Sequence, residues 1–170
     1  ETFIIHARKA WLKGLSPKEN RELPPLRYDL ALKLTQDFPK LNIILNGGIK
    51  TLPEVEQHLK DFKGVMLGRA ICDQPYLLAE VDQLIYGKTY SVPTRHAILA
   101  AYLPYLEQQL AKQQPLRLLC KPVLELFTGL PYARSWRRYL SETLPQEGFS
   151  ASKLLRAAAA ITDQRVAYDA

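Results

Sequence analysis

Three short apolar runs, separated by two amphipathic segments, constrain the fold of this chain more than any other feature. The runs span residues 2–8 (TFIIHAR), 41–48 (LNIILNGG) and 64–70 (GVMLGRA). Runs that are apolar at successive positions are typical of strands buried on both faces of a parallel sheet. The sequence therefore predicts three buried parallel strands.

The segments between these runs have the periodicity of helices. Residues 28–38 place Leu30 and Phe38 on one face and stop before a proline. Residues 51–62 open with the Thr-x-x-Glu pattern of a capping box and continue with an apolar stripe. Alternating strands and helices predict an α/β fold, and right-handed crossovers bring the carboxyl ends of the strands to one edge.

Polar and glycine residues end each run, so we expect them to meet at that edge. The candidates are His6, Asn46, Gly47, Gly48, Gly68 and Arg69. Glycine lets backbone N–H groups approach phosphate oxygens closely, and arginine adds a permanent charge with several donors. The pattern predicts a phosphate site like those after the last strands of (β/α)₈ barrels. The alternative is that the glycines only form turns and that His6 is an ordinary hydrogen-bonded residue.

Composition and the cysteines exclude several classes of protein. No apolar run approaches the roughly 20 residues of a membrane span, and the first residues lack a signal-peptide pattern. Cys72 and Cys120 are far apart without metal-ligand spacing, so we expect both to be packing residues. The sequence predicts a cytoplasmic protein with no metal site and no membrane partner.

The net charge of +6 is distributed unevenly. Residues 1–86 hold 12 Lys and Arg against 11 Asp and Glu, whereas residues 87–170 hold 11 against 6. A basic second half indicates an anionic partner, nucleic acid first, although a merely solubilising surface is the alternative. Four amphipathic segments in this half predict a helical bundle. They are residues 92–114, 115–127, 131–144 and 150–161.

The third of these segments combines a cationic face with an apolar one. The cationic side chains, at helical spacing, are Arg134, Arg137 and Arg138. Trp136, Leu140 and Leu144 fall where they can pack inward. A supported cationic helix suits a phosphate backbone, while an ordinary solvated face is the alternative.

Several motifs of the chain resemble those of the tRNA-dihydrouridine synthases, and in particular the A-type bacterial subfamily. They are HARKAWLKGLSPKENR at residues 6–21, PPL at 24–26, NGG at 46–48, GVMLGRA at 64–70 and QPYLL at 74–78. The resemblance implies α/β followed by all-α structure. Residues 1–86 would be the carboxy-terminal part of an FMN-binding (β/α)₈ TIM barrel, with its last three strands, and residues 87–170 a helical tRNA-binding domain.

The same resemblance implies a reaction and residue roles. In that family, reduced FMN gives a hydride to C6 of a uracil, a cysteine acid protonates C5, and NADPH re-reduces the flavin. The uridines at D-loop positions 20 and 20a become 5,6-dihydrouridine. His6 would contact the flavin, Asn46, Gly47 and Gly48 its ribityl-phosphate end, and Gly68 and Arg69 its phosphate. The tRNA contacts would be Lys18 and Arg21, in a long connection without predicted structure, together with Arg134 and Arg137.

The chain departs from the family pattern because about the first half of the barrel is absent. The family's catalytic cysteine lies in a motif upstream of these residues, so we assign no catalytic residue here and expect this chain alone, a monomer, to be inactive. One alternative is a non-catalytic RNA-binding remnant. Another is the terminal half of a different barrel enzyme acting on small sugar phosphates.

Overall fold

A computed structural model of the chain describes residues 1–161 and divides it into two compact units. The first unit is Glu1–Ala70 and the second starts at Ile71. This division lies earlier in the chain than the predicted boundary at residue 86, and the assignment of the two parts to cofactor and tRNA stays a prediction. Residues 162–170 of the predicted second domain lie outside the described residues.

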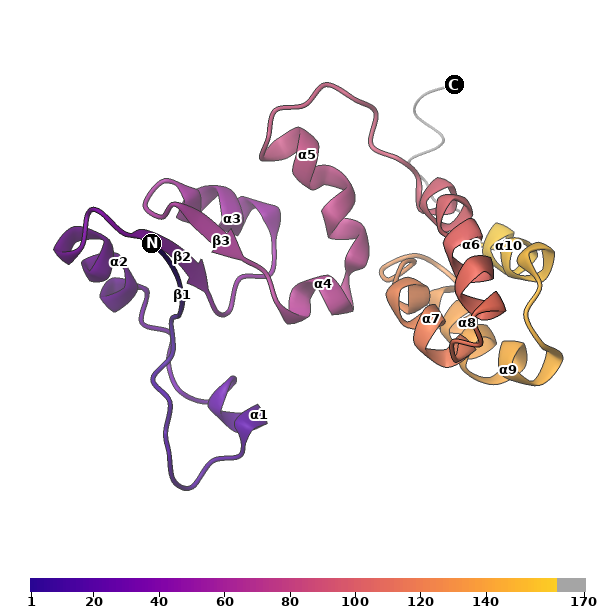
Figure 1. Cartoon of the computed structure of the whole chain (residues 1–170), viewed down its shortest axis with the longest axis horizontal. Helices are drawn as coiled ribbons and strands as arrows, with labels where there is room; N and C mark the ends of the chain where they lie inside the picture. Colours follow the sequence, from indigo (N-terminus) through magenta and orange to yellow (C-terminus); the bar gives the residue numbers. More distant parts are fainter. Residues whose placement is uncertain (162–170) are drawn as a thin grey trace. The chain divides into compact units, whose positions relative to one another are not determined.

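The first unit is a small parallel sheet joined by helices (Figure 1). Its strands are β1 (Thr2–His6), β2 (Asn42–Asn46) and β3 (Gly64–Met66), paired in the order β1-β2-β3. Helix α2 (Tyr28–Asp37) connects the first two strands and α3 (Leu52–Leu59) connects the last two. The predicted α/β arrangement of this part of the chain is confirmed.

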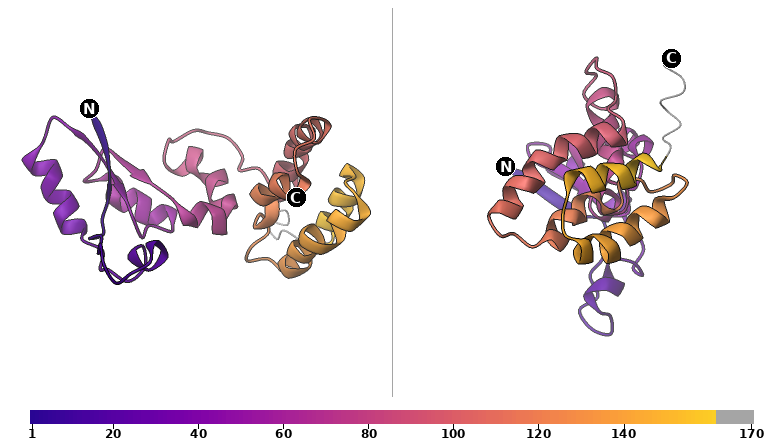
Figure 2. Two further views of the ribbon diagram at one scale, coloured as in Figure 1. Left: turned by 60° about the horizontal axis from the view of Figure 1, so that its bottom comes forward. Right: turned by 90° about the vertical axis from the view of Figure 1, so that its right-hand side faces the viewer.

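Reciprocal side-chain caps fix the start of α3 and of a short helix before it. Thr51 Oγ1 accepts from the Glu54 N–H, and the Glu54 carboxylate accepts from the Thr51 N–H at 2.9 Å, which confirms the predicted capping box of α3. The same reciprocal pair forms between Ser16 and Glu19 at α1 (Pro17–Asn20). This short helix lies in the connection that was predicted to have no structure, and it projects with its loop away from the sheet (Figures 1 and 2).

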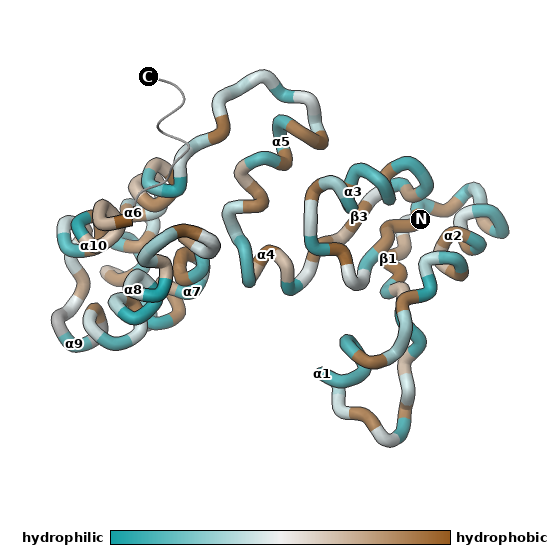
Figure 3. The backbone as a smooth tube through the Cα atoms, turned by 180° about the vertical axis from the view of Figure 1, so that it is seen from behind, coloured by the Kyte–Doolittle hydropathy of each residue, from teal (hydrophilic) through white to brown (hydrophobic). Residues whose placement is uncertain are grey.

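Burial differs sharply between the central strand and the two edge strands. Ile43 and Leu45 of β2 are buried, as predicted. Ile4 of β1 is 56% exposed and Phe3 is also exposed, so the prediction that β1 is buried on both faces is wrong. Met66 of β3 is 42% exposed, so the prediction of a buried strand is also wrong there. The physical reason is that β1 and β3 each pair only with β2 and are edge strands, although hydrophobic residues run along β1 (Figure 3).

Helix α2 also leaves much of its apolar surface uncovered. Its buried residue is Ala31, whereas Leu30 and Phe38, which were predicted to share one face, are each about half exposed. A three-stranded sheet offers too little surface to cover every apolar residue of the helices that pack on it. The unit therefore carries exposed hydrophobic side chains on both the strand and the helix.

Within the described residues, the regular elements of the second unit are all helical (Figure 2). Helix α4 (Arg69–Asp73) spans the division between the units. After it come a 3₁₀ helix (Pro75–Glu80), α5 (Val81–Leu84), α6 (Arg95–Ala111), α7 (Leu116–Leu124), α8 (Ala133–Arg138), a π-helical turn (Tyr139–Thr143), α9 (Leu144–Glu147) and α10 (Ala151–Ala159). Their core is built around Phe127 and Trp136, whose rings meet edge to face with centroids 5.1 Å apart.

Two helices of this unit continue through an internal proline, Pro104 in α6 and Pro122 in α7. Helix α6 continues through Pro104 to Ala111, because Leu99, Leu103 and Leu106 are buried on either side of the proline and hold both halves against the core. Within residues 1–161, none of the helices combines the length and the hydropathy that crossing a lipid bilayer requires.

Candidate functional site

The strand register brings the predicted polar residues to one edge of the sheet. His6 lies opposite Asn46, and Asn46 lies opposite Met66, so the three strands end level with one another. The Ala7 N–H donates to the Asn46 carbonyl at 2.8 Å, which extends the pairing past the strand ends. Gly47 and Gly48 follow β2 directly, and Gly68 and Arg69 follow β3. We call this set the carboxyl edge.

The two glycines after β2 are required by the backbone and by close contacts. Gly47 has φ +113° and Gly48 has φ +77°, where residues with a Cβ are strained. A Cβ on Gly47 would stand 3.1 Å from His6 Cε1, so the imidazole packs directly on the glycine. A Cβ on Gly48 would stand 2.4 Å from Leu26 Cδ1. The two glycines therefore let this turn pack against the His6 ring and the Leu26 side chain.

Tyr28 is a residue of this site that the sequence analysis missed. Its hydroxyl donates to the Gly47 carbonyl at 2.7 Å, and its ring meets His58 with centroids 4.6 Å apart. Burial, and then the charge of Glu54, raise the pKa of Tyr28, so the hydroxyl keeps its proton and remains a donor. A tyrosine at the start of an amphipathic helix carries no sequence signal for such a contact.

Arginines give the carboxyl edge a positive potential. Partial burial, followed by the charges of Arg8, Arg69 and Arg21, holds the pKa of His6 below its ordinary value of 6.5. The imidazole is therefore neutral at neutral pH, and the same cations that disfavour its protonation favour an anion beside it. A bound phosphate would raise the pKa of His6 again.

The long connection after β1 is tied to the carboxyl edge. Arg8 donates to the backbone carbonyls of Glu22 and Pro24, and the Arg8–Leu26 pair forms an antiparallel bridge that closes the connection at its base. Arg69 forms an ion pair with Glu22 at 2.6 Å and donates to the Arg21 carbonyl at 3.3 Å. One arginine of the predicted phosphate site thus also holds the connection.

Lys18 and Arg21, the predicted tRNA contacts of this connection, are exposed. Glu19 and Glu22 lie beside them in the sequence and could pair with them locally. Glu19 instead caps α1 and Glu22 pairs with Arg69, and no ion pair occupies Lys18 or Arg21 in the described part of the chain. Both cations are available to an external anion.

The arginines predicted on the third amphipathic segment lie in the helical unit and have different surroundings. Arg134 and Arg138 are exposed, whereas Arg137 pairs with the Glu125 carboxylate at 2.9 Å. Glu125 also accepts from Thr128 Oγ1 at 2.7 Å. Nothing in the sequence pattern predicted this pair. The cationic face therefore has two open arginines and one that is partly neutralised.

The inward face of the same segment is confirmed. Trp136, Leu140 and Leu144 are all buried, and the Trp136 indole N–H donates to the Val123 carbonyl at 2.9 Å. The five residues after Arg138 form a π-helical turn, and Leu140 within it stays buried. The arginines are thus carried by a segment that is fixed to the core.

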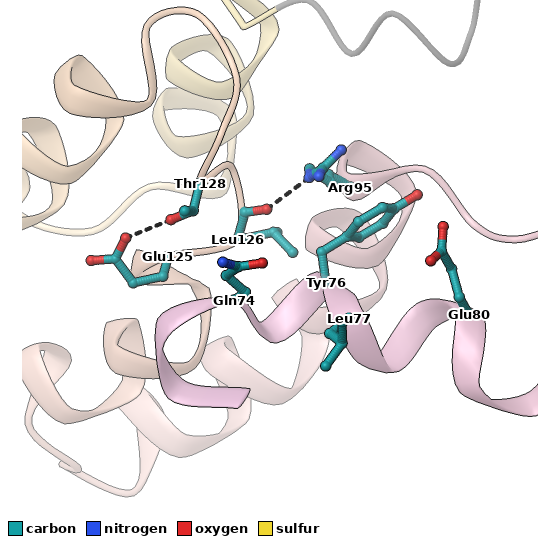
Figure 4. A pocket seen from close by; sticks show the side chains of 8 residues that line it. All are labelled: Gln74, Tyr76, Leu77, Glu80, Arg95, Glu125, Leu126 and Thr128. Atoms are coloured by element: carbon teal, nitrogen blue, oxygen red, sulfur yellow. Dashed lines mark hydrogen bonds between the residues drawn. The ribbon is translucent and has the colours of Figure 1, made fainter. Parts of the chain in front are cut away.

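A small polar pocket of about 170 Å³ lies in the helical unit near the start of α6 (Figure 4). Arg95 stacks 3.8 Å above the Tyr76 ring, and its Nε donates to the Leu126 carbonyl at 3.0 Å. These contacts join α6 to the segment before it and to the turn after α7. Because Arg95 is used in packing these segments together, we interpret the pocket as a gap where they meet and not as a ligand site.

The two cysteines differ from each other. Cys120 is buried, as expected of a packing residue, and burial raises the pKa of its thiol to about 11, which keeps it protonated and unreactive. Cys72 is exposed, so its predicted packing role is wrong: it lies on the solvent side of the short helix α4. Among the described residues, no group of three or more His, Cys, Asp or Glu side chains could hold a metal ion.

Comparison with known proteins decides the family. The model of the dihydrouridine synthase family, Dus, matches residues 1–163. The chain belongs to the dihydrouridine synthase family. It is 52% identical over 146 residues to the tRNA-dihydrouridine(20/20a) synthase of Shewanella oneidensis, which covers 86% of this chain and 44% of that protein.

Two further relatives of the same name extend the match along the chain. The Vibrio vulnificus protein is 47% identical over 164 residues, which are 96% of this chain and 50% of the relative. The Vibrio cholerae protein is 46% identical over 166 residues, which are 98% of this chain and 51% of the relative. This Dus chain spans about half the length of the curated relatives it matches.

The glycine geometry generates a prediction for the carboxyl edge. We expect Gly48→Ala to destabilise the α/β unit by about 1–3 kcal/mol, because alanine is strained at positive φ and its Cβ would displace Leu26. Gly68→Ala is the matched control, since a Cβ there meets nothing within 4 Å. Hydrogen exchange of the β2 amides measures both variants. Equal protection of β2 in the two variants would contradict the assigned role of Gly48.

Proposed function

We propose that this chain is part of a flavin-dependent tRNA-dihydrouridine synthase that reduces D-loop uridines 20 and 20a with NADPH as the reductant. The observation that carries the proposal is the family match over residues 1–163, with relatives named tRNA-dihydrouridine(20/20a) synthase. We assign residues 1–86 to the last part of the FMN-binding barrel and residues 87–170 to tRNA binding. The activity belongs in the cytoplasm, where tRNA is modified.

The residues of the carboxyl edge fit the phosphate end of FMN. The turn at Gly47 and Gly48 has no room for a Cβ, and the arginines near His6 favour a bound anion. We assign His6 to the flavin, Asn46 with the two glycines to its ribityl-phosphate end, and Gly68 with Arg69 to its phosphate. When bound, FMN supplies the hydride for the uracil ring.

The residues of this chain would bind and orient rather than transfer protons to the uracil. His6 is held neutral and packs on Gly47, so it can contact the flavin without adding a charge. Tyr28 fixes the Gly47 carbonyl and thereby the turn that carries the N–H groups. Lys18, Arg21, Arg134 and Arg137 would contact the phosphate backbone of tRNA.

Two alternatives are less well supported. A terminal half of a sugar-phosphate enzyme has no use for exposed cations on a helical unit, and the family match favours RNA chemistry. A non-catalytic RNA-binding remnant has no reason to keep two glycines at positive φ at the carboxyl edge. The synthase proposal accounts for both features.

We expect these 170 residues alone to form no dihydrouridine in unmodified tRNA supplied with FMN and NADPH. Of the two thiols, Cys120 is buried and protonated, and neither cysteine stands in a motif that resembles the family's acid. Mass spectrometry of digested tRNA measures the product, with the full-length Shewanella oneidensis relative as the positive control. Formation of dihydrouridine by this chain would show that it contains its own proton donor.

We expect the chain to bind tRNA with an affinity that falls steeply as salt rises. The double substitution Arg134→Ala/Arg137→Ala should weaken binding and reduce the slope of log K against log salt by about 1–2, because each lost phosphate contact removes ~0.7–0.9 from it. Fluorescence anisotropy of labelled tRNA measures this, with Arg156→Ala, an exposed arginine of α10, as the matched control.

An unchanged slope in the double variant, with circular dichroism showing that it is folded, would contradict the assignment of Arg134 and Arg137. Arg134 should account for most of the change. Arg137 should contribute less, because it must leave its ion pair with the Glu125 carboxylate in order to contact a tRNA phosphate.

A further inference from the structure

The outer end of the connection after β1 exposes two hydrophobic side chains between lysines. Trp11 is 47% exposed and Leu12 is 95% exposed, with Lys9 before them and Lys13 after them. A single exposed hydrophobic residue needs no explanation, but an aromatic and an aliphatic residue together at a projecting tip are unusual. We call residues 9–13 the loop tip.

The backbone of the loop tip is held in place by one side chain. The Trp11 N–H donates to Asn20 Oδ1 at 2.7 Å, and Asn20 Nδ2 donates to the Trp11 carbonyl at 2.9 Å. Asn20 Nδ2 also reaches the Leu15 carbonyl at 3.5 Å. Both backbone polar groups of Trp11 are therefore satisfied from inside the loop, while its side chain stays about half exposed.

The loop tip belongs to a connection that is anchored at the carboxyl edge. The Arg8–Leu26 bridge closes its base, and Glu22 pairs with Arg69. A ligand at the carboxyl edge and a ligand at the loop tip would thus both contact the connection after β1, which is held by its own internal hydrogen bonds. An ordered tip loses less conformational entropy on binding than a flexible one.

We propose that Trp11 and Leu12 pack against an unstacked nucleobase of the RNA substrate, and that Lys9 and Lys13 contact the flanking phosphates. Asn20 acts as the positioning residue of this surface. The inference rests on the proposed tRNA function and adds a base-contacting element to it. An enzyme that modifies a base inside a folded RNA must take that base out of its stack, and exposed apolar side chains can occupy or cover the place it leaves.

The chemistry of the loop tip favours RNA over a lipid surface. Single-stranded nucleic acid is bound by aromatic rings that stack on bases beside cations that track the backbone, which is the combination found here. Stable membrane attachment requires a larger apolar face than two side chains provide. Lys18 and Arg21 are exposed cations of the same connection, and they add to the positive charge that an RNA backbone could contact.

The positions of the two tryptophans make the proposal measurable in the whole chain. Trp11 is half exposed, whereas Trp136 is 2% exposed and bonded to the Val123 carbonyl. A nucleobase that stacks on an indole quenches its fluorescence, so quenching by an unmodified tRNA transcript reports Trp11. We expect this quenching to disappear in Trp11→Ala and Trp11→Phe, while the emission of Trp136 remains.

The affinity for the same transcript separates stacking from a structural effect. We expect Trp11→Ala to weaken binding by about tenfold and Trp11→Phe to stay within about threefold of the unsubstituted chain, because phenylalanine keeps a stacking face. Asn20→Ala should reduce the quenching of Trp11 because the tip loses its internal bonds. Leu118→Ala, which removes an exposed leucine from α7, is the control and should leave binding unchanged.

The outcomes that overturn the proposal can be told apart. If tRNA binds but does not quench Trp11, and Trp11→Ala binds equally well, the loop tip is not a base contact and the tRNA function stands. If the unsubstituted chain binds no tRNA at low salt, both fail. If vesicles of anionic phosphatidylglycerol, and not tRNA, shift the Trp11 emission, the tip is a membrane contact instead.

Discussion

In-register parallel pairing of β1, β2 and β3 is the constraint on which the carboxyl edge depends. Because His6, Asn46 and Met66 lie opposite one another, every turn that leaves a strand begins at the same level. Slipping one strand by a single residue would turn its side chains to the other face of the sheet. The glycines of the edge then allow a tight turn beside the His6 ring, and Tyr28 fastens that turn from α2.

The connection after β1 depends on the same edge. Its anchor combines the backbone bridge at Arg8 with the Arg69–Glu22 ion pair, and both partners of that pair are substantially exposed. An exposed pair of this kind contributes at most about 1 kcal/mol. A phosphate could therefore recruit Arg69 from Glu22 at little cost while the bridge keeps the connection in place. If the carboxyl edge binds a phosphate as proposed, this arrangement would link its occupancy to the surface proposed to meet RNA.

The sequence predicted what depends on local pattern, and missed what depends on distant partners. The strand ends, the capping box at Thr51 and the inward face around Trp136 follow from periodicity and from short-range hydrogen bonds. The exposure of Ile4 follows from β1 being an edge strand, which apolarity alone does not reveal. The partners of Arg69 and Arg137 are carboxylates far along the chain, and no spacing rule selects them.

The central claim is that backbone N–H groups of the carboxyl edge receive the phosphate of FMN. Its most direct test is a titration of the ¹⁵N-labelled chain with FMN, followed residue by residue in amide correlation spectra, with inorganic phosphate as the reference. The account predicts that both ligands produce saturable shifts of the amides of Gly47, Gly48, Gly68 and Arg69. It also predicts that FMN, but not phosphate, shifts the amide of His6. Shifts confined to the helical unit, or no shifts at millimolar FMN, would contradict it.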